Sequence, residues 1–158
     1  MIGLVIKLNQ AITKFKKHNY FLSNFFSAPV TYKQITYQNS EAAYQSMKCI
    51  MPMQRLEFAS LSAHDAKSKG KSVVLRYDWN HVKDQYMYEI VKAKFVQNPE
   101  LLERLLNTGD AFIEEGNHHG DKYWGTVEGK GRNKLGKILM RVRDELSQLG
   151  EDELSGQI

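Results

Sequence analysis

Apolar residues recur at helical spacing through most of the second half of the chain. They predict three amphipathic helices, over residues 81–97, 100–106 and 133–149. Asn80 is a suitable N-cap for the first of these, which should be the longest helix, and Pro99 suits the start of the second. Weaker patterns of the same kind predict two shorter helices, over residues 53–61 and, after an N-cap at Ser62, 63–69.

Short apolar runs predict only a few strands. Residues 30–32 and 35–37 are typical of a β-hairpin that turns at Lys33 and Gln34. Three further short strands are predicted, over residues 4–8, 12–15 and 111–115. Residues 21–26 contain three phenylalanines and are interpreted as an irregular loop held by its rings. This balance of elements predicts an α+β fold that is mainly α-helical.

The chain has the size and composition of one globular domain. Its 158 residues are predicted to form a compact domain over residues 1–149, followed by an acidic, frayed tail over 150–158. Hydrophobic residues make up 42% and charged residues 25%, and no apolar run approaches the ~20 residues of a membrane span. The lone Cys49 excludes an internal disulfide framework and suits a reducing compartment, so we expect a cytoplasmic protein.

One predicted helix, beginning at residue 40 and ending near Pro52, has a polar face where an apolar stripe is usual. That face combines a carboxylate, a phenol, an amide and an ammonium, on Glu41, Tyr44, Gln45 and Lys48. Ser40 is the expected N-cap, and Glu41 lies in the first turn, where the helix dipole favours negative charge. The segment is either a capped surface helix with a solvated face or one wall of a functional site.

Two further regions contain tryptophan beside charged residues. Residues 116–131 form a long loop with Asp121 and Trp124, and loops of this length are usually functional or disordered. Trp124 either anchors the loop by packing or offers a stacking surface for a base. Arg76 and Trp79 precede a helix, and they either pack at its start or present a guanidinium beside an indole.

The net charge of +4 favours partners that carry phosphate, either small molecules or nucleic acid. Residues 131–137 half-match a P-loop, but Ile138 occupies the position where a hydroxyl would bind Mg²⁺, so a nucleoside triphosphatase is excluded. Lys130, Arg132 and Lys134 still make the following helix start a candidate phosphate site. His118 and His119 have no partners at zinc spacing, so no metal is predicted.

These features together suit a ligand that contains a base, a ribose and phosphates. A carboxylate in such a pocket could assist cleavage of an N-glycosidic bond, because departure of the base leaves an oxocarbenium-like ribose that negative charge stabilises. The residue types by themselves do not distinguish a hydrolase from a binding module.

Several motifs, in one order, resemble the NADAR family of YbiA-like N-glycosidases. They are Phe21-Leu22-Ser23-Asn24-Phe25, the segment from Ser40 to Lys48, Leu75-Arg76 with Trp79, Lys94-Phe95, the segment from Asp121 to Gly125 and the segment from Gly131 to Gly136. The resemblance implies a compact, mainly helical α+β domain that hydrolyses N-glycosidic bonds to ribose without a metal or other cofactor. Two substrate classes are implied: phosphorylated ribosylamino-pyrimidine intermediates of riboflavin synthesis, and ADP-ribose attached to guanine, including guanine in DNA or RNA.

The resemblance also implies roles for individual residues. Glu41 would be the main catalytic carboxylate and Asp121 a second one, and which of them activates water is left open. The residues implied to bind substrate are Asn24, Tyr44, Gln45, Lys48, Arg76, Trp79, Trp124, Gly125 and Asn133. Ala42 and Ala43 stand where the family motif has bulkier residues, a difference that would widen the pocket.

Two other functions remain as alternatives. The same pocket would serve a non-catalytic module that binds ADP-ribose or a nucleotide phosphate. A general nucleic-acid binder is a weaker alternative, because the modest positive charge is spread along the chain. No membrane and no obligate protein partner are expected.

Overall fold

The computed structural model describes residues 10–155, with side chains described as far as residue 150. The predicted strand over residues 4–8 lies outside the described residues. In chain order the elements are the 3₁₀ helix η1 (Lys17–Leu22), the strands β1 (Ser27–Tyr32) and β2 (Ile35–Asn39), and the helices α1 (Ser40–Ser46), α2 (Pro52–Leu56), α3 (Ala63–Gly70), α4 (Trp79–Gln97), α5 (Pro99–Leu106) and α6 (Lys134–Ser155). The predicted α+β class, mainly helical, is confirmed.

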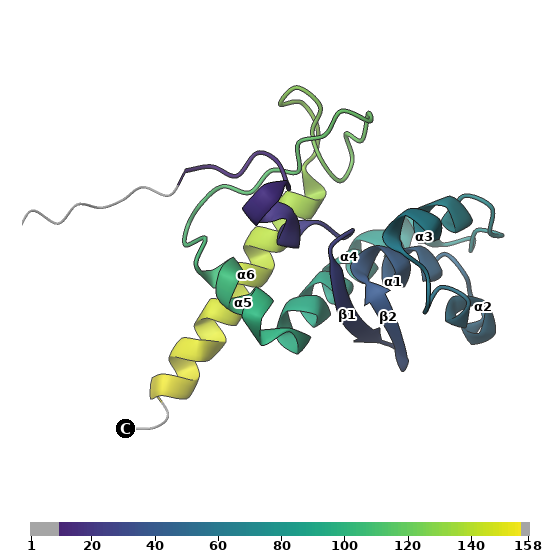
Figure 1. The fold of residues 1–158 in the computed structure, drawn as a ribbon, viewed down its shortest axis with the longest axis horizontal. Coiled ribbons are helices and arrows are strands. Elements are labelled where there is room, and N and C mark those ends of the chain that lie inside the picture. Colours follow the sequence, from purple (N-terminus) through teal and green to yellow (C-terminus); the bar gives the residue numbers. More distant parts are fainter. Residues whose placement is uncertain (1–9, 156–158) are drawn as a thin grey trace, which may run out of the picture.

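Helix α4 is the centre of the fold. It contacts the β-hairpin, α1, α5 and α6 (Figure 1). Its buried Met87, Ile90, Val91 and Phe95 belong to the main hydrophobic core. The helix begins at Trp79, after Asp78, so the predicted N-cap Asn80 is wrong and lies inside the first turn. At 19 residues α4 is shorter than the 22-residue α6, which continues past its predicted end at residue 149.

The predicted hairpin is confirmed. Strands β1 and β2 are antiparallel, with Val30 opposite Tyr37 and Tyr32 opposite Ile35. Lys33 and Gln34 both have positive φ angles, of 47° and 70°, which is the backbone of the tight turns that match the twist of a two-residue hairpin loop.

The predicted strands over residues 12–15 and 111–115 are wrong as regular elements. The two segments run side by side and pair at one isolated parallel bridge between Ile12 and Ile113. The Ile12 N–H donates to the Phe112 carbonyl at 2.8 Å, and the Glu114 N–H donates to the Ile12 carbonyl at 2.7 Å. This short pairing is enough to fix the direction of residues 111–115, which lead into the long loop.

Helix α1 is buried along its whole length, so it is not a surface helix. It packs against α3, α4 and the hairpin. Its N-cap is Asn39, one residue before the predicted Ser40, because the Asn39 Oδ1 accepts the Ala42 N–H at 2.8 Å. Ala42 and Ala43 are fully buried in the core, so their small size permits close packing of α1 and does not widen a pocket.

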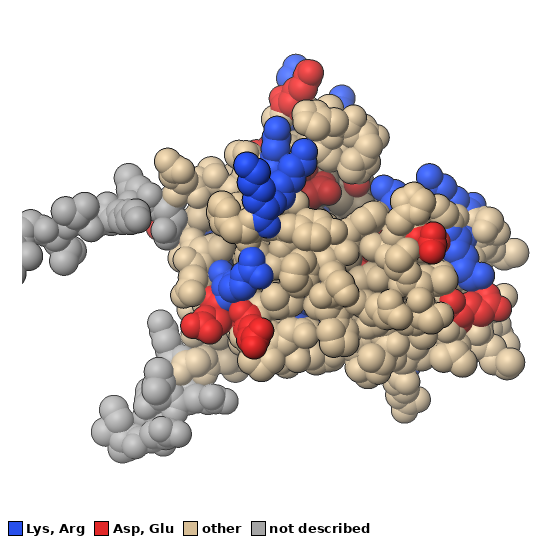
Figure 2. Space-filling view, viewed as in Figure 1, with Lys and Arg blue, Asp and Glu red and all other residues tan. Residues whose placement is uncertain are grey.

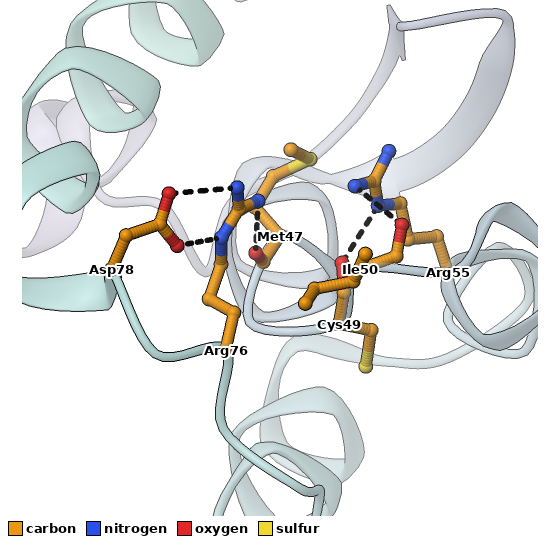
Figure 3. A network of polar contacts seen from close by, with 6 residues as sticks. All are labelled: Met47, Cys49, Ile50, Arg55, Arg76 and Asp78. Carbon is orange, nitrogen blue, oxygen red and sulfur yellow. Dashed lines mark hydrogen bonds and ion pairs between the residues drawn. The ribbon is translucent and has the colours of Figure 1, made fainter.

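Two arginines satisfy the backbone carbonyls that follow α1, which ends at Ser46 and not near Pro52 (Figure 3). Arg55 donates from Nε to the Cys49 carbonyl at 2.9 Å and from a terminal nitrogen to the Ile50 carbonyl at 2.9 Å. Arg76 reaches the Met47 carbonyl at 3.4 Å and forms an ion pair with Asp78, with Nε 2.6 Å from Oδ1. These contacts stabilise the helix end without a glycine cap.

Candidate active site

A cavity of about 480 Å³ is enclosed by α1, the segment after η1, parts of α3 and α4, and the loop of residues 115–124. Most of the predicted site residues line it: Asn24, Glu41, Tyr44, Gln45, Lys48, Trp79, Asp121 and Trp124. Figure 2 shows acidic side chains recessed below the protruding late loop, with basic side chains at the surface on either side. We call the α1 residues and Lys48 the helix wall, and Glu115, Asp121 and Trp124 the loop wall.

Glu41 is the buried acid of the helix wall, with 8% of its surface exposed. Burial raises the pKa of its carboxyl group above the usual range. A hydrogen bond from the Gln45 Nε2, at 2.8 Å, and the nearby Lys67 and Lys48 ammonium groups act in the opposite direction and favour the charged form. The site therefore holds a carboxylate that is desolvated but surrounded by groups that stabilise its charge.

Helix α3 packs closely against the helix wall. A Cβ added to Gly70 would lie 1.9 Å from the Gln45 Oε1, so any larger residue at the end of α3 would have to displace the Gln45 amide. Among the described residues, the Gln45 Oε1 itself accepts no hydrogen bond although it is buried. The close approach of α3 also places Lys67 at the cavity.

Three aromatic rings form one side of the cavity. The Tyr44 ring lies 5.2 Å from the Trp79 ring and 5.5 Å, edge to face, from the Trp124 ring. Lys48 places its Nζ 6.0 Å from the Trp79 ring centre. Stacking on such rings is the usual way in which proteins hold a base without reading its identity.

Asp121 orders the turn that presents Trp124. One carboxylate oxygen, Oδ1, accepts the N–H groups of Tyr123 at 3.0 Å and Trp124 at 2.9 Å. Asn117 holds Asp121 from the other side, because its amide accepts the Asp121 N–H at 3.1 Å and donates to the Asp121 carbonyl at 2.8 Å. The loop wall is thus fixed by side-chain contacts to the backbone in place of regular structure.

A buried ammonium group positions Asn24. Lys94 of α4 is 1% exposed and donates from Nζ to the carbonyls of Phe21, at 2.6 Å, and Ser23, at 3.0 Å. Burial lowers the pKa of Lys94 to about 7. The Asn24 carbonyl in turn accepts the Glu41 N–H at 3.0 Å, so this segment is tied to the first turn of α1.

Three predicted binding residues lie behind the cavity and do not line it. Arg76 is engaged by Asp78 and the Met47 carbonyl. Asn133 is buried and bridges two backbone groups, donating to the Ile113 carbonyl at 2.9 Å and accepting the Glu115 N–H at 3.0 Å. Gly125 is buried against Glu115. Each of them supports a wall of the cavity.

The candidate phosphate site before α6 is also separate from the cavity. Lys134 forms an ion pair with Asp84, and Arg132 lies 5.5 Å from the centre of the Tyr123 ring. Tyr123 also donates a hydrogen bond to Asp84. The basic groups that line the cavity are instead Lys48, Lys67 and Lys83.

Glu115 was not among the predicted site residues, although it lines the cavity. Burial raises the pKa of its carboxyl group to about 7, and the negative charges of Asp121 and Glu41 act in the same direction. An alternating pattern along residues 111–115 indicates the position of Glu115. Ala111 and Ile113 are buried and their neighbours are exposed or half-buried, so Glu115 is the next inward-facing residue. Lys67 lies on the inward face of α3 in the same way, next to the buried Ala66 and near Gly70.

Within the described part of the chain, no three or more His, Cys, Asp or Glu side chains are grouped so that they could hold a metal ion. The same residues include no helix with the length and apolarity needed to cross a membrane.

The fold and the cavity define a small α+β domain with a buried carboxylate and an aromatic side in one pocket. A model of the NADAR domain matches residues 12–147, and the chain belongs to this family. A riboflavin biosynthesis protein of Vibrio vulnificus is 38% identical over 134 residues, which are 81% of this chain and 36% of that protein. The N-glycosidase YbiA of Escherichia coli is 35% identical over 129 residues, covering 79% of this chain and 80% of YbiA.

The solved structures include a close match to the fold. The NMR structure of the Escherichia coli protein YbiA superposes with a TM-score of 0.80 and 33% sequence identity, over 90% of this chain and 89% of YbiA. The chain spans little more than a third of the Vibrio protein's length, so that relative contains other regions as well.

Proposed function

We propose that this chain is a hydrolase that cleaves the N-glycosidic bond between a base and a ribose or phosphoribose. The observation that carries the proposal is the shared cavity of Glu41 and Trp124, in which a desolvated carboxylate and an aromatic surface are available to one ligand. The printed names of the relatives, N-glycosidase and riboflavin biosynthesis protein, support the same reaction type.

The chemistry follows from the charge that develops on the sugar. When the base leaves, positive charge builds up on the ribose ring, and a carboxylate in a water-poor site stabilises this charge far better than it would in bulk water. Glu41 is the better candidate for this role and for accepting a proton from water. Asp121 has one carboxylate oxygen already occupied by two backbone N–H groups.

The lysines of the cavity support a phosphorylated substrate. Lys48, Lys67 and Lys83 all line the cavity, while Tyr44, Trp79 and Trp124 offer ring surfaces to a base. We infer two substrate candidates: ADP-ribose attached to guanine in nucleic acid, and phosphorylated ribosylamino-pyrimidine intermediates of riboflavin synthesis. Both contain a base, a ribose and phosphate.

A paired assay tests the proposal and chooses between the substrates. The protein is incubated with guanine-ADP-ribosylated DNA and, separately, with a ribosylamino-pyrimidine phosphate, and released ADP-ribose or free base is quantified by mass spectrometry. We expect turnover of at least one, with Escherichia coli YbiA as a reference enzyme. If neither is cleaved, the proposal is contradicted, and tight ADP-ribose binding by calorimetry would then indicate a non-catalytic binding module with the same aromatic pocket.

A further inference from the structure

The cavity is lined by a further, partly buried acid whose role the family resemblance did not suggest. Glu115 lies on the loop wall and lines the same cavity as Glu41 and Asp121. It follows the buried Ile113 by two residues in an extended segment, so both side chains point inward. The site therefore contains carboxyl groups on both walls.

The backbone of Glu115 is held firmly. Its N–H donates to the Asn133 Oδ1 at 3.0 Å, and its carbonyl accepts the Thr126 N–H at 2.9 Å. The side chain lies against Gly125, where an added Cβ would be 1.8 Å from the Glu115 Oε2. The missing Cβ at Gly125 leaves room for this carboxyl group where Glu115 lines the cavity.

The side chain of Glu115 has little to stabilise a negative charge. Its Oε2 accepts a long hydrogen bond, 3.3 Å, from the Asn117 Nδ2. Among the lysines that line the cavity, Lys67 lowers the pKa of Glu115. Glu41 has a shorter hydrogen bond from Gln45 and two ammonium groups near it. Carboxyl groups that share a buried site do not all ionise together, so one keeps a proton. Glu41 is the more deeply buried of the two, but it has the shorter hydrogen bond and more ammonium groups near it, so we assign the proton to Glu115.

Other titratable groups also surround Glu115. The adjoining hollow, which Glu115 also lines, is bordered by Lys14, Lys16, His118 and His119. Positive charge around this hollow lowers the proton affinity of Glu115, so the pH at which Glu115 ionises depends on the whole group of side chains.

We propose, on the basis of the hydrolase function above, that Glu115 is the general acid that protonates the departing base. Water attacks the ribose C1′ as the bond from C1′ to the base nitrogen breaks, and the bonding electron pair leaves with that nitrogen. Glu115 gives its proton to the nitrogen, while the Glu41 carboxylate takes a proton from the water. The products are the free base and a ribose hydroxyl, and one proton passes back from Glu41 to Glu115 through solvent.

A leaving-group comparison tests this role. The N-glycoside cleaved by the wild type is compared with 4-nitrophenyl ribofuranoside 5-phosphate, whose nitrophenolate leaves as a stable anion and needs no proton. We expect Glu115→Gln to lower kcat on the N-glycoside by about 10²-fold, the usual contribution of a general acid, and to leave the nitrophenyl substrate nearly unaffected. A general loss of structure would lower both rates together.

The pH profile provides a second readout that does not depend on the variant. A general acid must be protonated, so wild-type kcat on the N-glycoside should fall as the pH rises through about 7, the pKa of Glu115. The nitrophenyl substrate should lack this fall. Glu115→Asp keeps a carboxyl group on a side chain that is one methylene shorter. It should show the wild-type pH dependence, which Glu115→Gln lacks, with a lower kcat than the wild type.

Glu128→Gln is the matched control, because Glu128 is an exposed acid of the same late loop. It should leave both rates unchanged. Equal losses on both substrates in Glu115→Gln, or the same pH profile for both substrates in the wild type, would overturn the role of Glu115. A wild type that cleaves no N-glycoside is a different result, since it removes the proposed hydrolase function itself.

Discussion

The two walls of the cavity are built in different ways. The helix wall takes its side chains from α1, whose periodicity alone places Glu41, Tyr44 and Gln45 on one face. The loop wall has no regular structure, and Asn117, Asp121 and Asn133 hold it by side-chain hydrogen bonds to the backbone. The helix wall can therefore adjust one side chain at a time, whereas a change in the loop wall moves the backbone and several groups together.

The largest expected difference comes from adding one methyl group against the back of each wall. In Gly125→Ala the new Cβ would lie 2.1 Å from the Glu115 backbone oxygen, and the backbone has no room to yield. In Gly70→Ala it would meet the Gln45 side-chain amide, which can turn away. We expect a loss of unfolding free energy of about 3 kcal/mol for Gly125→Ala and about 1 kcal/mol for Gly70→Ala, measured by urea denaturation.

Gly150→Ala is the control for this pair, because nothing lies within 4 Å of its added Cβ. It should be neutral or stabilise the helix by up to about 1 kcal/mol. Equal costs for Gly70→Ala and Gly125→Ala would show that the two walls do not differ in this way.

The next largest effect is a pH dependence of the free energy of unfolding, caused by Glu115 of the loop wall. The pKa of Glu115 is about 7 in the folded protein and near 4.3 in an unfolded chain. The folded state therefore binds more protons between these values. This stabilisation is fully present below about pH 4.3 and is lost as the pH rises through about 7. Relative to Glu115→Gln, the wild type should lose on the order of 2 kcal/mol across this window.

Urea denaturation of both proteins at several pH values measures this difference. The free energy of unfolding of the wild type minus that of Glu115→Gln should decrease steadily from pH 4.5 to pH 7.5. A difference that stays constant with pH would mean that Glu115 ionises normally and that the loop wall does not desolvate it.

A smaller effect is expected at Arg76, where resemblance and structure differ. The resemblance implies contact with the ligand, whereas in the structure the guanidinium binds Asp78 and the Met47 carbonyl behind the helix wall. Arg76→Met should lower the free energy of unfolding by about 1 kcal/mol through the lost hydrogen bonds. Its KM for the substrate should be close to that of the wild type. A large rise in KM with unchanged stability would show that Arg76 binds the substrate.

The sequence predicted the helix wall better than the loop wall, for a physical reason. Helical periodicity relates Glu41 to Tyr44 and Gln45 directly, and the hairpin turn at Lys33 and Gln34 is local as well. The cap at Asn39 was missed by one residue, because asparagine and serine both cap helices and stand side by side.

The roles on the loop wall depend on contacts that local patterns do not encode. Asn133 was expected at the ligand, but its side chain binds the backbone of Ile113 and Glu115, about twenty residues earlier in the chain. The alternation along residues 111–115 gives the inward direction of Glu115, but its raised pKa depends on Asp121 and Glu41, and Glu41 comes from a distant part of the sequence.

Glu41 is proposed to act on the glycosidic bond and not merely to shape the pocket. Glu41→Gln keeps the size of the side chain and removes its charge. With the substrate that the paired assay identifies, single-turnover rates and the Kd for ADP-ribose or the ribose phosphate product should be measured for both proteins. We expect cleavage to slow by about 10²-fold or more while the Kd changes little. Cleavage by Glu41→Gln at the wild-type rate would contradict the account.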